Sequence, residues 1–336
     1  MLEKPILVES RIEACLLLEY QIRVKELYFL PLGADRDTAV YRVQAADGES
    51  YFLKLRSGRF KRALTEFPEY LKRQGIRHIL SPIRTSSGNL QANLDPFKVI
   101  LYPFINGQNA YQAKMSSRQK IDLGNTLRNI HSFIPPQEVV KGVPRERFSE
   151  KYRVSVRNSL RLVENQIFEE ALAEEFADLI QTKSGVIKEL LSRATRYAGI
   201  LRKQPLVFTY CHGDIHGWNL LIQDERNFYI VDWDTLIYAP KERDLMFFGG
   251  KLGGIGYFPA EEERLFYQGY GKVEINPTAI SYYRCERILE DIAIFCKQGL
   301  QSVGNLEDRK KALDYLKTNF LPDGTIDVAL SSDASG

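Results

Sequence analysis

Three polar residues between 208 and 234 have the types and the order that a magnesium–phosphate site requires. Asp214 and Asn219 follow one β-branched and aromatic run, and Asp232 ends a second apolar run. Amide and carboxylate oxygens bind Mg²⁺, and another carboxylate can accept the proton of an alcohol that attacks a bound phosphate. The stretch therefore predicts transfer of a phosphoryl group, with Asp214 as the catalytic residue and with Asn219 and Asp232 as magnesium ligands.

The spacing of these residues matches the protein-kinase pattern H-R-D-x-x-x-x-N, with the later aspartate in the place of the one in D-F-G. Two departures limit the match. Gly213 replaces the arginine, so we do not expect an activation loop that phosphorylation controls. Trp233 replaces the phenylalanine of D-F-G, so a switch based on a moving phenylalanine is not expected either. His212 is expected to brace the loop.

A nucleotide-binding sheet is expected in the N-terminal part of the chain. The runs 26–33, 39–45 and 51–55 predict three short strands, and Asp47-Gly48 predicts a tight turn between the last two. Lys54 lies within the third run, where an ammonium is costly to bury unless it meets an anion. In a kinase that anion is a phosphate of ATP. The alternative is an edge-strand lysine that extends to water.

Two further features of the N-terminal part leave their roles open. The loop 33–38 lies where a kinase folds a loop over the phosphates, but it is not rich in glycine. If the loop stood alone, an ordinary hairpin turn would be the better interpretation. A helix is expected over 66–74, ending at Gly75. Either Glu66 or Glu69 could pair with Lys54, as a glutamate does in protein kinases, and either could instead lie at the surface.

From residue 116 onward the sequence has mainly helical periods. Ser116 and Gln119 form a capping box that begins one helix, and two or three charged helices are expected within 148–203. Helices near 260–270 and 277–299 follow, the second with several acidic residues among aromatic ones. The expected strands thus lie in the N-terminal part of the chain and the long helical periods follow them.

The composition is that of an ordinary globular protein. Its 336 residues have a net charge of +3 with scattered basic residues, which does not favour nucleic acid or a membrane surface as a partner. No apolar run approaches the ~20 residues of a membrane span. The four cysteines are far apart, which fits buried thiols in a reducing compartment better than disulfides or zinc. We therefore expect a cytoplasmic protein, monomeric or a weak homodimer, with a small-molecule partner.

Two other classes of protein compete with a kinase. Residues 213–217 match the metal-binding G-D-x-H-G of calcineurin-like phosphoesterases, whose two-metal sites need further histidines downstream. The chain has four histidines and none after His216, so its ligands are too few. The second alternative is a catalytically inactive, kinase-like binding protein. It is disfavoured because Lys54 is present together with the three polar site residues.

The motifs H-G-D-I-H-G-W-N at 212–219 and I-V-D-W-D at 230–234 resemble the aminoglycoside phosphotransferase family, within which choline kinases are relatives. The resemblance implies an α+β, protein-kinase-like bilobal fold, with a small antiparallel sheet in the N-terminal lobe and a larger, mainly helical C-terminal lobe. It also implies the use of ATP and Mg²⁺. The lobes would span 1–102 and 108–336, joined by a hinge at 103–107. In that hinge the carbonyl of Pro103 and the N–H of Ile105 would read the adenine edge, and Lys54 would bind the nucleotide phosphates.

Further motifs, A-P-K-E-R-D-L-M-F at 239–247 and S-Y-Y-R-C-E-R-I-L-E-D-I-A at 281–293, are most similar to the spectinomycin phosphotransferases. The resemblance implies a cationic aminocyclitol as acceptor and a role in antibiotic resistance. A polycation requires carboxylates beside aromatic faces, and Asp234, Glu290 and Asp291 are the expected substrate ligands, with Glu286 near them. Choline or a sugar is the alternative acceptor.

Overall fold

The computed structural model describes residues 4–32, 37–58, 60–249, 259–301 and 305–332. Most of the loop expected to cover the phosphates, residues 33–36, lies outside these ranges. The chain forms two compact units, one of 1–144 with 217–236 and one of 145–216 with 237–336. This division follows contacts within the chain and does not test whether 103–107 is a hinge. The lobes 1–102 and 108–336 therefore stay a prediction.

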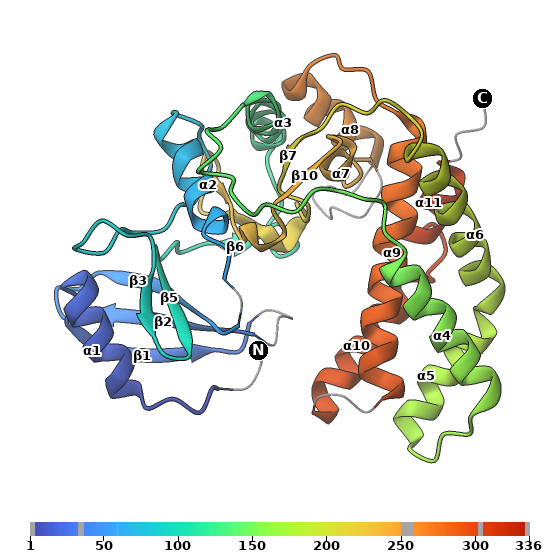
Figure 1. Ribbon diagram of the computed structural model, residues 1–336, viewed down its shortest axis with the longest axis horizontal. Coiled ribbons are helices and arrows are strands. Elements are labelled where there is room, and N and C mark those ends of the chain that lie inside the picture. The colour runs from blue at the N-terminus through green and yellow to red at the C-terminus, as the bar shows by residue number, and fades with distance from the viewer. Residues whose placement is uncertain (1–3, 33–36, 59, 250–258, 302–304, 333–336) are drawn as a thin grey trace. The chain divides into compact units, whose positions relative to one another are not determined.

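The first unit contains a five-stranded antiparallel sheet with the order β1-β2-β3-β5-β4 (Figure 1). Its strands are β1 (Val24–Leu30), β2 (Thr38–Ala45), β3 (Ser50–Arg56), β4 (Ala92–Leu94) and β5 (Phe97–Pro103). The turn between β2 and β3 contains Gly48, whose φ of 93° suits a residue without a Cβ. The strands predicted from the alternating apolar positions are therefore present, with Lys54 on the central strand β3.

Helix α1 (Glu9–Tyr20) packs on this sheet with one apolar face. Ile12 and Leu16 are fully buried in a cluster with inward-facing residues of the strands. The Tyr20 hydroxyl, at the end of the helix, donates a hydrogen bond to the Val99 carbonyl at 3.2 Å. Burial of these side chains fixes the sheet that carries Lys54, since burying a large apolar side chain stabilises the fold by roughly 1.5–3 kcal/mol.

Two helices and a small sheet complete the first unit. Helix α2 (Ala63–Arg73) ends before Gly75, whose φ is 81°, and helix α3 (Ser117–Ser132) begins with the predicted capping box of Ser116 and Gln119. The small sheet has the order β6-β8-β9, and its members are β6 (Gln108–Asn109), β8 (Leu220–Ile222) and β9 (Phe228–Ile230). Two short 3₁₀ helices flank it, η1 (Gly217–Asn219) and η2 (Trp233–Thr235).

The second unit is mainly helical, as the helical periods of the sequence predict. Its helices are α4 (Lys151–Asn165), α5 (Ala171–Thr182), α6 (Ser184–Leu201), α7 (Glu242–Leu245), α8 (Pro259–Tyr270), α9 (Pro277–Leu300), α10 (Leu306–Asn319) and α11 (Thr325–Ser331). Strands β7 (Thr209–Cys211) and β10 (Ile237–Ala239) pair antiparallel. Separate strand and helix regions confirm the predicted α+β class.

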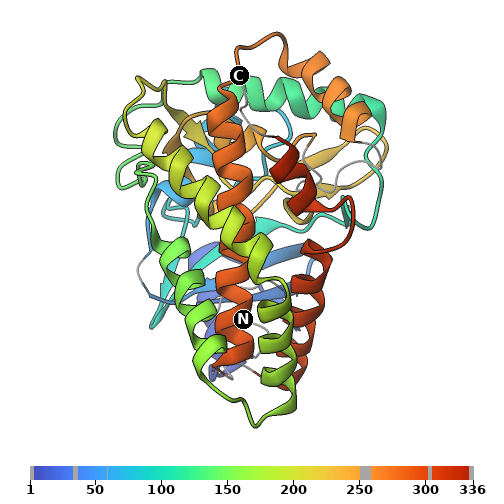
Figure 2. The same ribbon diagram turned by 90° about the vertical axis from the view of Figure 1, so that its right-hand side faces the viewer.

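Helix α9 is the central helix of this unit. Asn276 caps its first turn, with its side chain accepting from the Ala279 N–H at 3.2 Å, and Pro277 occupies the first turn, where its missing N–H costs nothing. Helices α4, α6 and α10 pack along α9, which is the long orange helix in Figure 2. At Gly299 a methyl group would overlap the ring of Phe176, so glycine allows α5 to approach closely.

Arg153 of α4 is fully buried inside the second unit. Its guanidinium donates to Glu286 at 2.8 Å and to the carbonyls of Ser149 at 2.9 Å and Ala194 at 3.2 Å. A buried charge is tolerated only when it is paired and hydrogen-bonded, and this one joins α4, α6 and α9.

Among the described residues, no helix is long and apolar enough to cross a membrane.

Candidate active site

The loop that carries Asp214 follows β7 and is held by a buried carboxylate. Asp244, which is fully buried on α7, accepts hydrogen bonds from the backbone N–H groups of His212 at 2.9 Å and Gly213 at 2.7 Å. Gly213 has a φ of 85°, a conformation that favours glycine over the arginine of protein kinases. The buried His212 ring accepts from the Asp214 N–H at 3.3 Å, so it braces the loop as predicted.

The Asp214 carboxylate is hydrogen-bonded at both of its oxygens. Arg287 Nη1 of α9 donates to Oδ1 at 2.8 Å, and His216 Nε2 lies 3.2 Å from Oδ2. Burial alone would raise the pKa of Asp214. The His216 hydrogen bond and the Arg287 charge outweigh burial and hold this pKa well below its usual range. Asp214 is therefore ionised at neutral pH and oriented by two side chains.

Helix α9 presents three charged side chains on the face that contains Arg287. Glu290 and Asp291 follow Arg287 by three and four residues, and positions with this spacing share one face of a helix. Arg287 Nη2 lies 3.5 Å from Asp291 Oδ1, and Nη1 lies 4.0 Å from Glu290 Oε2. Burial, and after it the negative charge of Glu290, raise the pKa of Tyr152 on α4. Burial raises the pKa of Asp291 to about 6, although Arg287 opposes the shift.

Glu286 lies one turn earlier on α9 and has a different environment. Only 6% of its surface is exposed, and its carboxylate accepts from Arg153. Burial raises the pKa of Glu286, although the charge of Arg153 opposes the shift. Sequence reasoning placed Glu286 beside the acceptor; in the structure its carboxylate belongs to the core of the second unit.

The two candidate magnesium ligands lie at adjacent ends of β8 and β9 in the first unit. Leu220 pairs with Ile230, and the Val231 N–H donates to the Asn219 carbonyl at 3.0 Å, which brings Asn219 beside the residue before Asp232. Asp232 has φ 62° and ψ 73°, a left-handed conformation that aspartate tolerates and that is common at functional sites. Amide and carboxylate oxygens are suitable donors for Mg²⁺, so these residues fit the ion.

Lys54 reaches the same end of the first unit from β3. Its Nζ lies 3.0 Å from Asp232 Oδ1 and 2.8 Å from Asp234 Oδ2, and Arg56 of the same strand also pairs with Asp234. Burial disfavours the charged ammonium, but the two carboxylates outweigh it and raise the pKa of Lys54. The lysine is thus a buried, permanently charged cation, which excludes the alternative of a side chain that extends to water.

The remaining sequence candidates of the first unit have these positions. Glu66 pairs with Arg62 at 2.7 Å and Glu69 pairs with Arg84 at 2.6 Å, so both have partners other than Lys54. Pro103 is the last residue of β5, and Ile105 follows in the next loop. The ring of Trp233 is buried against Phe67 of α2, with centroids 5.7 Å apart. The tryptophan that replaces the phenylalanine of D-F-G is thus packed inside the first unit.

Sequence reasoning missed three residues that the structure places at these sites. Arg287 contacts Asp214, Asp244 holds the loop, and Arg56 pairs with Asp234. For Arg287, the sequence shows only an arginine with acidic residues three and four positions later, and this pattern is typical of a solvated helix face. Asp244 had no such signal, because it ends the charged run 241–244 and only the structure shows that it is buried.

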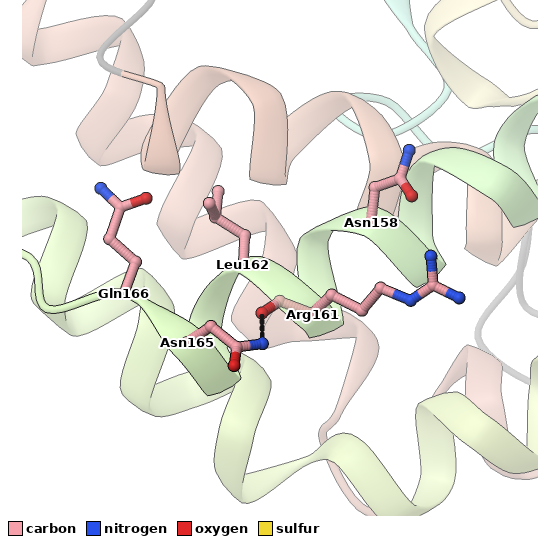
Figure 3. Close-up of a pocket in the computed structure, with 5 residues that line it drawn as sticks. All are labelled: Asn158, Arg161, Leu162, Asn165 and Gln166. Atoms are coloured by element: carbon pink, nitrogen blue, oxygen red, sulfur yellow. Dashed lines mark hydrogen bonds between the residues drawn. The ribbon is translucent and has the colours of Figure 1, made fainter.

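A separate depression of about 380 Å³ lies on α4, as Figure 3 shows. It is lined by five residues of α4 and its C-cap: Asn158, Arg161, Leu162, Asn165 and Gln166. Asn165 Nδ2 donates to the Arg161 carbonyl at 2.7 Å, so this amide is occupied within its own helix. The depression contains no carboxylate or nucleophile, and we assign no chemistry to it.

An ionised aspartate in the second unit, and an amide, a further aspartate and a buried lysine in the first, are the residue types that a phosphotransferase uses. Residues 29–279 match the Phosphotransferase enzyme family. The chain therefore belongs to this family, the aminoglycoside phosphotransferase family, and is a kinase that transfers phosphate to hydroxyl acceptors. The predicted family and enzyme class are confirmed.

Three known proteins show how far the similarity extends. The spectinomycin phosphotransferase APH(9)-Ia, in complex with ADP and spectinomycin, is 32% identical, with a TM-score of 0.91 over 98% of this chain and 99% of that one. The predicted kinase-like fold is thereby confirmed. An amicoumacin kinase bound to AMP-PNP shares the fold, with a TM-score of 0.62 and 17% identity over 93% of each chain.

The curated Protein StrN of Streptomyces griseus is 26% identical over 180 residues. The match covers 52% of this chain and 55% of that protein, so it spans about half of the length of the relative.

Proposed function

We propose that the protein phosphorylates a hydroxyl group of a spectinomycin-like aminocyclitol with ATP. The observation that carries the proposal is the ionised Asp214 carboxylate, 2.8 Å from a charged face of α9 that also contains Glu290 and Asp291. An aminocyclitol has hydroxyl and ammonium groups on one ring. Such a site offers an acceptor for the hydroxyl proton and carboxylates for the ammonium groups within one unit.

The residues of the first unit would bind the nucleotide. Lys54 would exchange its carboxylate partners for the phosphates of ATP, and Asn219 and Asp232 would hold Mg²⁺, which compensates charge on the phosphates when bound. The Pro103 carbonyl and the Ile105 N–H would hydrogen-bond to the adenine edge. These roles are the ones that the protein-kinase pattern and the family resemblance assign to these positions.

Asp214 would accept a hydrogen bond from the attacking hydroxyl and orient it towards the phosphate. Its low pKa makes it a weak base, so removal of the proton before attack is disfavoured. The transition state of phosphoryl transfer is loose, and positioning and charge compensation supply most of the rate. Asp214 can therefore act mainly by orientation and receive the proton late in the reaction.

The acceptor cation would be bound by Glu290 and Asp291. Arg287 pairs with both carboxylates and with Asp214, and Arg243 also interacts with the charge of Glu290, so three carboxylates face two guanidinium groups here. Asp234 is the weaker candidate among the predicted substrate ligands, because Lys54 and Arg56 both pair with it. Contacts that are largely ionic should weaken as salt rises.

A panel of acceptors tests this function. ADP release coupled to a dye reaction is measured with spectinomycin, kanamycin, choline and simple sugars, each at saturating Mg²⁺-ATP. We expect spectinomycin to stimulate ADP release well above the rate without acceptor. If choline or a sugar turns over while both antibiotics give background rates, the antibiotic proposal is wrong and the kinase assignment remains. Spectinomycin sensitivity of cells that express the protein in their cytoplasm tests the resistance role.

A further inference from the structure

Arg287 contacts the catalytic carboxylate from a different element than His216 does. Asp214 and His216 belong to the loop after β7, whereas Arg287 belongs to α9, the central helix of the same unit. A carboxylate held at one oxygen can still rotate about its Cβ–Cγ bond. With Arg287 on Oδ1 at 2.8 Å and His216 at 3.2 Å from Oδ2, rotation would break one of the two contacts. The plane of the carboxylate is therefore fixed.

The guanidinium of Arg287 is itself held on its other side. Nη1 contacts Asp214, and Nη2 lies 3.5 Å from Asp291, which is four residues later on α9. A guanidinium is planar and donates in a rigid fork, so two carboxylates that contact different nitrogens fix its orientation. The side chain of Arg287 is 22% exposed, which leaves little room for other rotamers. Asp214 is thus tied to the helix through Arg287.

We propose that Arg287 is a positioning residue for phosphoryl transfer: it fixes the Asp214 carboxylate in the orientation that receives the acceptor hydroxyl, and Asp291 and Glu290 hold it in place. The proposal rests on the proposed role of Asp214 and does not depend on which alcohol is the acceptor. A carboxylate has about four acceptor sites, so the contacts from Arg287 and His216 are compatible with a further bond from a hydroxyl.

Arg287 has two opposite effects on the rate, and their sizes predict the outcome of its removal. Its charge keeps Asp214 weakly basic, which slows any step that needs early proton removal. Its contact keeps Asp214 oriented, which speeds a step that depends on alignment. In a loose transition state little proton transfer has occurred when the phosphoryl group moves, so orientation dominates. Removal of Arg287 should therefore lower kcat.

The test compares Arg287→Met and Arg287→Lys with the wild-type protein. Arg287→Met removes both the charge and the contact, and we expect kcat to fall at least ~10-fold, a modest share of what a positioned group contributes. The KM for ATP should stay the same, and the KM for a cationic acceptor should not rise, because the group removed is a cation. Arg287→Lys keeps the charge but lacks the planar fork, so its kcat should lie between the other two.

Arg193→Met is the matched control. Arg193 is also an arginine of the second unit, with 20% of its side chain exposed and a glutamate, Glu189, four residues earlier on its own helix α6. Its loss should leave kcat unchanged. Thermal unfolding of all variants shows whether they are folded, and Arg287→Lys carries the test if Arg287→Met does not fold, because the lysine variant keeps the charge balance.

Several results would overturn the proposal. The first is a kcat of Arg287→Met equal to that of the wild type, and the second is a rise of the KM for ATP in Arg287→Met. The third is a kcat of Arg287→Lys equal to that of either the wild type or Arg287→Met. The rate of ADP formation with water as acceptor is measured in the same series. If spectinomycin is not a substrate, this rate still reports the order of the variants, so failure of the proposed function and failure of the positioning role are distinguishable.

Discussion

Lys54 and Asp232 form an ion pair between positions 178 residues apart, with 3.0 Å between Nζ and Oδ1. The two partners differ in exposure: the side chain of Lys54 is 10% exposed and that of Asp232 is 49% exposed. The lysine is thus held inside the first unit, while the aspartate keeps a face open to solvent. Binding of magnesium and phosphates would replace this internal pair by contacts of each residue with the nucleotide complex.

The separate roles of these two residues predict different effects of mutation. Asp232→Ala should raise the Mg²⁺ concentration for half-maximal activity at least ~10-fold, since a charged ligand of the ion is lost. Lys54→Ala should raise the KM for ATP and leave the Mg²⁺ requirement nearly unchanged. Titration of Mg²⁺ against activity at several ATP concentrations separates the two effects. Equal metal requirements in both variants would contradict the assignment of Asp232 as a magnesium ligand.

The loss of the Asp214 carboxylate should have a large effect on turnover. Asp214→Asn keeps the size of the side chain but removes the charge that attracts the hydroxyl proton, so kcat should fall at least ~100-fold. Nucleotide binding should change little, because the residues assigned to ATP are in the first unit. Steady-state kinetics together with ADP binding by calorimetry checks both points. Near-normal turnover would show that another group orients the acceptor.

The raised pKa of Asp291 predicts a pH-dependent cost to stability. Its pKa in the folded protein is about 6 against an ordinary 3.8, so the folded state binds the proton more tightly than the unfolded state. Protonation of Asp291 therefore favours the folded state. This stabilisation is complete at pH values below 3.8 and is lost as the pH rises through about 6. Asp291→Asn avoids this loss and should stabilise the protein at pH 7.5 by about 1 kcal/mol, discounted for partial exposure.

Urea unfolding of the Asp291→Asn variant at two pH values tests this sign. The gain in the free energy of unfolding over the wild type should be present at pH 7.5 and should nearly vanish at pH 4. A variant that is less stable than the wild type at pH 7.5 would show that the contact with Arg287 outweighs the cost of burying the carboxylate.

The buried Arg153 should be important for the stability of the second unit. Arg153→Met leaves Glu286 without its charged partner and should lower the free energy of unfolding by about 3 kcal/mol. The double variant Arg153→Met, Glu286→Leu removes both charges and should recover most of this loss. Arg161→Met, an exposed arginine on the same helix, is the control and should have little effect. A double variant no more stable than the single one would contradict this account of the pair.

The sequence was sufficient for the elements whose signals are local. Alternating apolar residues predicted β2 and β3, and the Ser116–Gln119 box predicted the start of α3, because each signal depends on neighbours within a few residues. Asp214, Asn219 and Asp232 could be proposed as site residues because the motif that contains them lies within one short stretch of chain. The order of the strands β5 and β4 in the sheet had no such local signal.

The contacts of the site were not predictable in the same way. Arg287 reaches Asp214 across 73 residues, and Asp234 pairs with Lys54 across 180 residues. A charge pattern along one helix gives the face on which Arg287, Glu290 and Asp291 lie but not what that face meets. Glu286 shows the same limit. It lies one turn before Glu290 on α9, but its side chain is buried and pairs with Arg153.

The most direct test of the central claim measures the product itself. Protein, Mg²⁺-ATP and spectinomycin are incubated, and ADP and phosphorylated spectinomycin are quantified together by mass spectrometry, with Asp214→Asn as the matched control. The account predicts one phosphorylated spectinomycin for each ADP formed, and almost none of either with the Asp214→Asn protein. ADP without a phosphorylated product, or equal product from both proteins, would contradict it.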